Sequence, residues 1–330
     1  FLIVYNIFMA LLECVPNISL SAAEDVRRVA CAVQNTPGAT LLHTDSNPAA
    51  NRTVLTFAGT AEAVFQAARA CLKTTLELAD MRFHRGAHPR LGALDVCPFV
   101  PVSGITLQEA ARLAVRFGQL AAQEFNVPVY LYEAAARRAQ TRNLADVRRG
   151  EYESLPQKLQ ILPPDFGPCV FNTGVAKTGA SVIGARPFLI AFNINLNTQD
   201  PAPAKKIAAV LREKNGGLKA VKAIGWYMEN FRRAQISCNL TDFTQTGPAQ
   251  VFAAAQKEAQ KLGFMATGCE LVGLIPLQAL LAAGRFYAPE QTDETALIRA
   301  AVNGLSLSDV KPFNPHEQIL EYRLKALTAR

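Results

Sequence analysis

The stretch ATLLHTDSNPAANRTVLTFAG, residues 39–59, decides how this chain folds. It predicts two strands, residues 39–45 and 52–59, joined by a turn that contains the Asn and Pro residues that turns favour. The second strand alternates in polarity, which is typical of a strand with one buried face. Helical patterns flank the two strands at residues 21–34 and 60–79. Two paired strands between two helices indicate an α+β unit.

The pattern extends outward by one strand on each side. Residues 10–16 (ALLECVP) and 93–102 (ALDVCPFVPV) are apolar runs that predict strands. The first helix opens with Ser21 and Glu24 at the spacing of a capping box. The complete order is strand, helix, strand, strand, helix, strand, which is the order of the ferredoxin-like plait.

Beyond this unit, the sequence predicts a helix at residues 106–125, capped by Thr106 with Glu109, and a strand at 128–133. A short basic helix follows, and we interpret the basic patch at residues 136–150 as a helix face and its end. Residues 162–186 are rich in Pro and Gly, so we predict a loop there that separates two domains.

The second half of the chain repeats the order. Its expected elements are a strand at 187–196, a helix at 202–217, strands at 220–228 and 234–243, a helix at 248–263, a strand at 267–273 and a helical tail from about Tyr287. We therefore expect an α+β protein with two tandem ferredoxin-like subdomains, residues 9–182 and 183–330, and a substrate cleft between them. Residues 1–8 precede Met9, and we expect them to be a non-native or upstream extension.

Composition narrows the class of protein. Of 330 residues, half are hydrophobic and 18% charged, as in a globular protein with a substantial core. The net charge of +7 attracts anions, but no nucleic-acid motif accompanies it, so we expect no nucleic-acid partner. The seven cysteines are widely spaced without a CxxC pair, which argues against a disulfide framework or zinc module and favours a reducing cytoplasm. The apolar run at residues 1–17 is too short to span a bilayer, so we expect no membrane association.

The clearest candidate for chemistry is FHRGAHPRLGALDVCPF, residues 83–99. His84 and His88 are four residues apart, but Gly86 and Pro89 break the helix that would align them, so we expect no metal. A histidine transfers protons near neutral pH, and an arginine such as Arg90 grips a carboxylate with two N–H groups. The alternative is a surface histidine among solvated arginines, and the residue types alone leave both interpretations open.

Two further segments carry weaker signals. The turn HTDSNPAANRT, residues 43–53, contains Asp45, Asn51 and Arg52, which serve either a binding site or ordinary turn chemistry. The segment GVAKTGAS, residues 174–181, is only loosely similar to a phosphate-binding loop, and a mobile linker is the favoured interpretation.

Taken together, these segments resemble the formiminotransferase family over nearly the whole chain, from about Leu12 to Tyr322. The matching pieces are ECVPN, NRTVLTFAG, HPRLGALDVCPFVPV, VPVYLYEAAAR, GEYESLPQKL, PDFGP, GARPFLIAFNINL, KAIGWYMEN and ELVGLIPLQALL. The resemblance implies two ferredoxin-like subdomains with a tunnel-like cleft, and a homodimer. It also implies transfer of a formimino group between N-formimino-L-glutamate and N5 of tetrahydrofolate, a step of histidine breakdown.

The resemblance also implies roles for residues. The catalytic acid/base of the family's His-Pro-Arg motif falls on His88. The folate-contacting segment after Asp-Phe-Gly-Pro falls on residues 167–179, from which we take Gly167, Pro168, Thr178 and Gly179 as folate-binding. From charge and placement we assign Asp45 to stabilise the cationic amidine. The residues expected to bind the substrate and its carboxylates are Asn51, Arg52, Arg82, Arg85 and Arg90.

Ala87 departs from the family pattern, because a Glu usually precedes the catalytic histidine. Two alternatives stay open: formyl transfer between N-formylglutamate and tetrahydrofolate, and a folate-binding protein without activity. Tetrahydrofolate is expected as co-substrate, with or without a polyglutamate tail, and no metal. Because the chain ends where the transferase ends, ring closure with loss of ammonia would require a separate cyclodeaminase.

Overall fold

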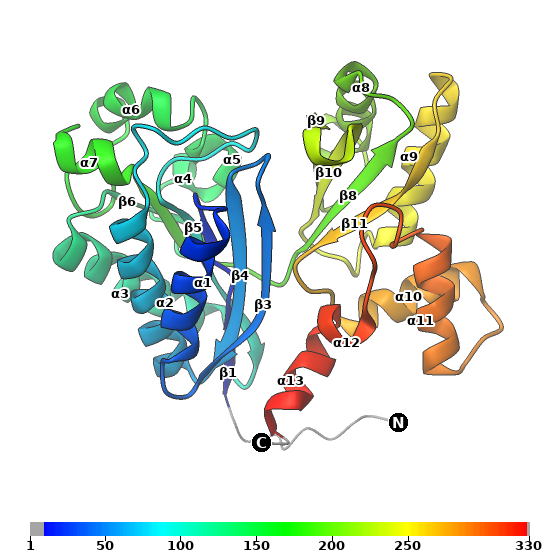
Figure 1. Cartoon of the computed structure of the whole chain (residues 1–330), viewed down its shortest axis with the longest axis horizontal. Helices are drawn as coiled ribbons and strands as arrows, with labels where there is room; N and C mark the ends of the chain where they lie inside the picture. Colours follow the sequence, from blue (N-terminus) through cyan, green and yellow to red (C-terminus); the bar gives the residue numbers. More distant parts are fainter. Residues whose placement is uncertain (1–9, 329–330) are drawn as a thin grey trace. The chain divides into compact units, whose positions relative to one another are not determined.

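The computed structural model describes residues 10–328, which form two units (Figure 1). The first unit ends at Pro187 and the second begins at Phe188. Each unit contains one β-sheet with helices packed against it, so the predicted α+β class is confirmed. The expected extension at residues 1–8 lies outside the described residues.

The sheet of the first unit has seven strands. They are β1 (Leu11–Cys14), β2 (Asn17–Ile18), β3 (Ala39–Asn47), β4 (Arg52–Gly59), β5 (Leu94–Ser103), β6 (Val129–Glu133) and β7 (Ser181–Ala185). Both β1 and β2 pair with β4 on one side and β5 on the other, so they are two halves of one strand, interrupted where Pro16 lacks an N–H donor. β3 pairs with β4 at one end, and β7 and β6 extend the sheet in parallel beyond β5.

Helices cover the first sheet unevenly. They are α1 (Ala23–Gln34), α2 (Ala61–Leu78), α3 (Leu107–Phe125), α4 (Ala139–Arg142), α5 (Leu144–Val147), the 3₁₀ helix η1 (Tyr152–Ser154), α6 (Leu155–Ile161) and α7 (Thr173–Thr178). α1, α2 and α3 share a core with the sheet, in which Phe117 packs edge-on against Phe99 with ring centroids 5.5 Å apart. A second core, which includes Val182, brings α5, α6 and α7 against the other face of β5, β6 and β7.

Strand register decides which side chains point away from the face of the sheet that the helices cover. Leu55 and Phe57 of β4 point into the core with α1 and α2. Because side chains alternate along a strand, Arg52 and Val54 point the other way. Asp45 of β3 pairs with Val54, so Asp45 and Arg52 share the face opposite the helices.

One of the two predicted capping boxes is confirmed. Thr106 and Glu109 cap α3 reciprocally, as predicted. The box predicted at Ser21 and Glu24 is wrong, because α1 begins after Ala22 and has no side-chain cap. Ser21 instead donates to Asn51 Oδ1 at 2.9 Å, a partner that is distant in sequence.

The loop predicted at residues 162–186 contains a helix and a strand. α7 begins after Asn172, whose side chain accepts a hydrogen bond from the N–H of Val175. β7 then runs between β5 and β6 and is buried along its whole length. A boundary at residues 182 and 183 would cut this strand, so the division between the units falls instead after Pro187.

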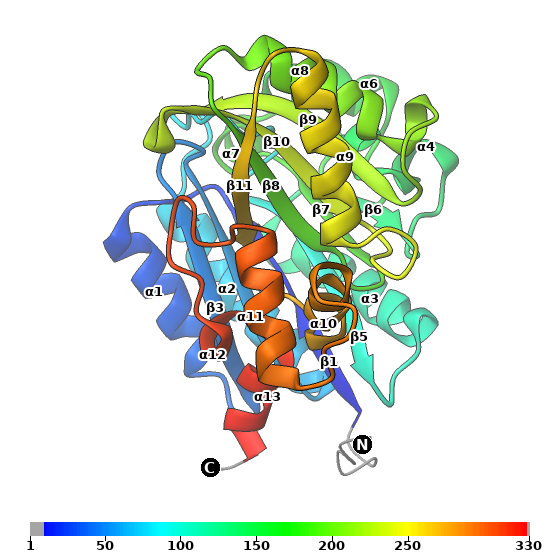
Figure 2. The same ribbon diagram turned by 90° about the vertical axis from the view of Figure 1, so that its right-hand side faces the viewer.

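The second unit has a four-stranded antiparallel sheet in the order β11-β8-β10-β9. The strands are β8 (Ile190–Leu196), β9 (Val221–Met228), β10 (Arg233–Leu240) and β11 (Ala266–Val272). The helices are α8 (Pro201–Leu211), η2 (Glu213–Asn215), η3 (Glu229–Phe231), α9 (Pro248–Lys261), α10 (Leu277–Tyr287), α11 (Glu294–Gly304), α12 (Pro315–Gln318) and α13 (Leu320–Thr328). Figure 2 shows α8 and α9 on one face of this sheet, where they share its core. The substrate cleft predicted between the subdomains stays a prediction.

Candidate active site

The loop that carries the His-Pro-Arg triplet connects α2 to β5 and is held against the turn between β3 and β4. The N–H of Ala87 donates to the carbonyl of Ala49 at 3.1 Å. A Cβ on Gly86 would lie 2.2 Å from the carbonyl oxygen of Ala50, so only glycine permits this approach. The backbone of Ala87 therefore fixes the loop while its side chain is exposed.

His84 is a buried member of this loop and connects it to its surroundings. Its Nε2 lies 2.8 Å from the carbonyl oxygen of Asn51, which can only accept, so Nε2 carries the proton. Nδ1 then accepts from Arg90 Nε at 3.2 Å. Burial, together with the positive charge of Arg90, lowers the pKa of His84. His84 is thus a neutral positioning residue.

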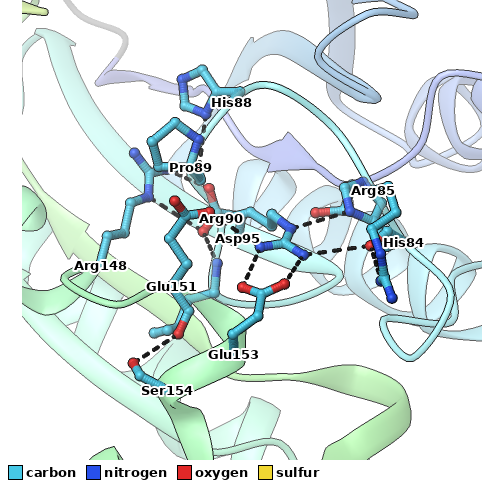
Figure 3. Close-up of polar contacts among 12 residues, drawn as sticks. His84, Arg85, His88, Pro89, Arg90, Asp95, Arg148, Glu151, Glu153 and Ser154 are labelled. Atoms are coloured by element: carbon cyan, nitrogen blue, oxygen red, sulfur yellow. Dashed lines mark hydrogen bonds and ion pairs between the residues drawn. The ribbon is translucent and has the colours of Figure 1, made fainter.

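His88 is half-buried, and Figure 3 shows it in the same group of side chains as Arg148. Its Nδ1 lies 2.7 Å from the carbonyl oxygen of Pro89, so Nδ1–H donates and the neutral ring keeps its basic lone pair on Nε2. Burial is the main cause that lowers the pKa of His88 well below its ordinary value, and the positive charges of Arg52 and Arg148 lower it further. The ring is consequently a base that stays unprotonated at neutral pH.

Asp95 holds the two arginines together from the start of β5. Its fully buried carboxylate accepts from Arg52 Nη1 at 2.6 Å, from Arg148 Nη2 and from the N–H of Leu91 at 2.9 Å. Burial alone would raise the pKa of Asp95, but the charges of Arg148 and Arg52 outweigh burial and lower that pKa to about 2. Burial lowers the pKa of Arg52 to about 10, at which the guanidinium is still charged at neutral pH.

Arg90 is buried and uses all five of its N–H donors within the protein. Its Nη1 and Nη2 bind Glu153 at 2.7 and 2.6 Å, and Nη1 also binds Glu151 at 3.1 Å. Nε and Nη2 bind Nδ1 and the carbonyl oxygen of His84. In this structure Arg90 anchors the loop to η1, and its predicted role in binding substrate stays a prediction.

Arg82 and Arg85 are exposed, unlike Arg90 and Arg52. Arg82 pairs with Asp80 at 2.5 Å, and Arg85 Nη1 donates to the carbonyl of His84 at 2.7 Å. Asn51 adopts a left-handed conformation (φ 45°), and its Nδ2 donates to the carbonyl of Arg85 at 2.9 Å. Asn51 therefore ties the β3–β4 turn to the loop.

The predicted folate-binding residues fall in two places. Thr178 and Gly179 lie beside the segment that leads from His88 to Asp95, since the carbonyl of Thr178 accepts from the N–H of Ala93 at 2.8 Å. Gly167 and Pro168 instead follow Phe166, whose carbonyl pairs with Val129 at the start of β6. The structure thus brings only the first pair against the His-Pro-Arg segment.

Within residues 10–328, no group of three His, Cys, Asp or Glu side chains is arranged to hold a metal ion. Across the same described part of the chain, no helix combines the length and apolar character needed to cross a membrane.

Comparison with known proteins assigns the family. The model of the formiminotransferase domain, N-terminal subdomain, matches residues 11–186, and the model of the formiminotransferase domain matches residues 191–325. The chain belongs to the formiminotransferase domain family. The two matched ranges meet near the division between the two units, so each unit of this formiminotransferase domain corresponds to one family model.

Relatives of this formiminotransferase domain include fused and free-standing proteins. It is 47% identical over 326 residues to formimidoyltransferase-cyclodeaminase of Rattus norvegicus, covering 94% of this chain and 59% of the rat protein. It is 40% identical to glutamate formimidoyltransferase of Thermoplasma acidophilum, covering 84% of this chain and 92% of that protein. For the protein of the same name from Streptococcus pyogenes serotype M1, the identity is 35% and the coverage 95% and 98%. The chain thus spans about three-fifths of the fused relatives it matches.

Four charged residues that bind the arginines of this formiminotransferase domain's candidate site, or are themselves such arginines, were not predicted from the sequence. Asp95 lies inside an apolar strand pattern, and Arg148 lies in the basic patch for which the sequence predicts only a helix face and its end. Glu151 and Glu153 belong to the matching piece GEYESLPQKL, which was the available signal for them. Their pairing with arginines far away in sequence was not visible in any local pattern.

The backbone of Gly179 lies close to that of Leu91 and Gly92, which predicts the effect of a substitution on the stability of this formiminotransferase domain. Gly179 has φ +65°, and a Cβ there would lie 2.4 Å from both Gly92 Cα and the carbonyl oxygen of Leu91. We expect Gly179→Ala to lower the free energy of unfolding by about 1–3 kcal/mol, measured by urea denaturation. The matched control is Gly174→Ala in the same segment, whose Cβ would only approach the Asn172 side chain at 3.3 Å. Equal stability of the two variants would contradict the argument.

Proposed function

We propose that this chain transfers a formimino group between N-formimino-L-glutamate and N5 of tetrahydrofolate, giving 5-formiminotetrahydrofolate and L-glutamate, as a step of histidine degradation. The names of the relatives from Thermoplasma acidophilum and Streptococcus pyogenes support the reaction class, because the chain covers nearly all of both proteins. One structural observation carries the mechanism. His88 is a half-buried histidine whose Nδ1–H is bound to a carbonyl and whose Nε2 is basic.

The reaction needs one proton moved between two nitrogens. When N5 of the folate attacks the formimino carbon, a C–N bond forms and N5 becomes cationic. His88 accepts that proton at Nε2 and then donates it to the glutamate nitrogen as the original C–N bond breaks. The Pro89 carbonyl stabilises the imidazolium formed in between, because it accepts from Nδ1–H throughout.

Charged side chains around His88 suit the proposed substrates. The protonated amidine is cationic, and Asp45 shares the sheet face of Arg52, so we assign its carboxylate to stabilise that charge. Glutamate and the folate tail carry carboxylates, which arginines bind with paired N–H groups. The net charge of +7 favours the approach of such anions.

Tetrahydrofolate is the proposed co-substrate, with or without a polyglutamate tail. Thr178 and Gly179 fit this role best among the residues predicted for it, because their backbone packs beside the His88 segment where only glycine has room. Gly167 and Pro168 lie next to β6, so they would contact a part of tetrahydrofolate that is farther from the reacting N5.

We also propose the subdomain fold, the oligomeric state, the cellular location and a further protein partner. The strand orders β5-β1-β4-β3 and β11-β8-β10-β9 support a ferredoxin-like plait in each unit, the first extended by β7 and β6. A homodimer, a cytoplasmic location and a separate cyclodeaminase partner are proposed from the family resemblance and the cysteine pattern. The fusion in the rat relative is compatible with such a partner.

The pKa of His88 gives a direct test of its role. Because burial and the charges of Arg52 and Arg148 disfavour the imidazolium, we expect His88 to titrate below pH 6.5, so kcat/KM should decline only at more acidic pH. An NMR titration of the imidazole carbons, with the His88 signal assigned by its loss in His88→Ala, measures this pKa. A His88 pKa at or above 6.5 would contradict the proposed environment.

Donor preference separates the proposed reaction from its alternatives. Purified protein with tetrahydrofolate is assayed in parallel with N-formimino-L-glutamate and N-formyl-L-glutamate. We expect a higher kcat/KM with the formimino donor. A preference for the formyl donor would support the formyltransferase alternative, and folate binding without either turnover would support a binding protein.

A further inference from the structure

Two arginines share one buried carboxylate beside His88. Asp95 has no exposed surface, while the side chains of Arg52 and Arg148 are only 8% and 13% exposed. Two guanidinium charges and one carboxylate leave one positive charge without a counterion in this group. Because buried charges are stable only when they are paired, the group favours an added anion.

Both arginines keep N–H donors for such an anion. Arg148 uses Nε and one Nη2–H on Asp95, and Arg52 uses Nε on Asn17 at 3.1 Å and Nη1 on Asp95. Among residues 10–328, Nη1 of Arg148 and Nη2 of Arg52 make no hydrogen bond. Asn17 and Asp95 therefore orient the two guanidinium groups, and the remaining N–H donors of these groups are available to a ligand.

The other arginines predicted to bind substrate are less suitable. All five N–H groups of Arg90 are used within the protein, mainly on Glu151 and Glu153. Arg82 is exposed and pairs with Asp80, and the exposed Arg85 is held by a backbone carbonyl. Only Arg52 among the predicted four combines burial with unused donors, and Arg148 is its partner.

The pair also lies at the reacting centre. The positive charges of Arg52 and Arg148 both act on the His88 ring, and Figure 3 shows Arg148 bound to Asp95 in the same group of side chains as His88 and Pro89. Asp95 accepts from the N–H of Leu91, three residues after His88, so the position of the pair is coupled to that of the histidine.

We propose that Arg52 and Arg148, held together by Asp95, bind the α-carboxylate of the acidic donor next to His88; this inference rests on the proposed formimino transfer. In an N-substituted amino acid, the reacting nitrogen and the α-carboxyl carbon are bonded to the same Cα and lie about 2.5 Å apart. Gripping that carboxylate beside His88 places the nitrogen where the histidine must protonate it. Asp95 acts here as a positioning residue.

Arg148→Gln tests the proposal, with Arg149→Gln as the matched control. Arg149 is adjacent in sequence but exposed, and its partner is Asp146. We expect Arg148→Gln to raise the KM for N-formimino-L-glutamate and the Kd for L-glutamate, measured by calorimetry, by about 10- to 100-fold. The same variant should not affect the KM for tetrahydrofolate. Arg149→Gln should leave all three values near those of the parent protein.

Two further probes sharpen the result. Glutamine, which keeps the α-carboxylate, should bind in an Arg148-dependent manner, whereas the α-amide of glutamate should bind weakly to parent and variant alike. Arg148→Lys keeps a positive charge next to Asp95 and so maintains the fold. Because lysine lacks the paired N–H donors of a guanidinium, the KM of this variant for the donor should also rise. If Arg148→Gln fails to fold, Arg148→Lys decides.

The outcomes separate this inference from the proposed function. Normal transfer by the parent protein, with an unchanged donor KM in Arg148→Gln or Arg148→Lys, would overturn the inference and leave the function standing. Arg148-dependent binding of L-glutamate without any transfer would support the inference and overturn the function.

Discussion

His88→Ala is expected to lower formimino transfer by about 10²-fold or more, the usual contribution of a general acid/base. In the proposed mechanism, the variant lacks the group that carries the proton from N5 to the glutamate nitrogen. Folate binding should be largely retained, because the backbone hydrogen bonds that hold the proposed folate-binding residues Thr178 and Gly179 do not involve the His88 side chain. Steady-state turnover together with tetrahydrofolate binding by fluorescence measures both quantities.

Two controls distinguish a catalytic loss from a structural one. His316→Ala changes an exposed histidine that stacks on Tyr322 in the second unit, and it should leave turnover unchanged. Added imidazole should partly restore transfer to His88→Ala, since it supplies the missing base. Near-normal turnover of His88→Ala without imidazole would refute the assignment.

Asp95→Asn is expected to destabilise the protein at pH 7 by about 3–5 kcal/mol, because it leaves two buried guanidiniums facing a neutral amide. The carboxylate is fully buried and contacts both Arg52 and Arg148. Urea denaturation of the variant and the parent measures the difference. The control Asp146→Asn removes an exposed carboxylate that pairs with Arg149 and should cost less than about 1 kcal/mol.

The pH dependence of that difference gives a second readout. The folded-state pKa of Asp95 is lowered to about 2, so the carboxylate binds fewer protons in the folded than in the unfolded protein. Its contribution is complete above the unfolded pKa of about 4 and is lost as the pH falls toward 2. The stability gap between the parent and Asp95→Asn should therefore narrow between pH 4 and pH 2. A gap that stays constant over this range would show that the charge of Asp95 is not the cause.

Regular elements with one buried face were predictable from the sequence. The strand pair at residues 39–59 and the helix capped by Thr106 and Glu109 are present, because alternation and capping are local signals. β7 was missed because a parallel strand that is buried on both faces shows no alternation. The cap at Ser21 was wrong because a distant partner, Asn51, binds that hydroxyl.

The candidate site was predictable only in part, because several of its residues bind partners that are distant in sequence. His88 stands in a recognisable motif, and the structure gives it a defined tautomer and two neighbouring cations. Whether an arginine binds substrate or protein depends on partners supplied by the fold. Glu151 and Glu153 occupy the N–H donors of Arg90. Asp95 pairs with Arg148, which lies in a basic segment whose sequence does not indicate a buried partner.

The proposed transfer reaction can be measured directly through both of its products. Purified protein is incubated with N-formimino-L-glutamate and tetrahydrofolate, and L-glutamate and 5-formiminotetrahydrofolate are quantified by mass spectrometry over time. We expect both products to form in equal amounts, and omission of tetrahydrofolate to abolish release of L-glutamate. Release of L-glutamate without the folate product, or no consumption of the donor, would contradict it.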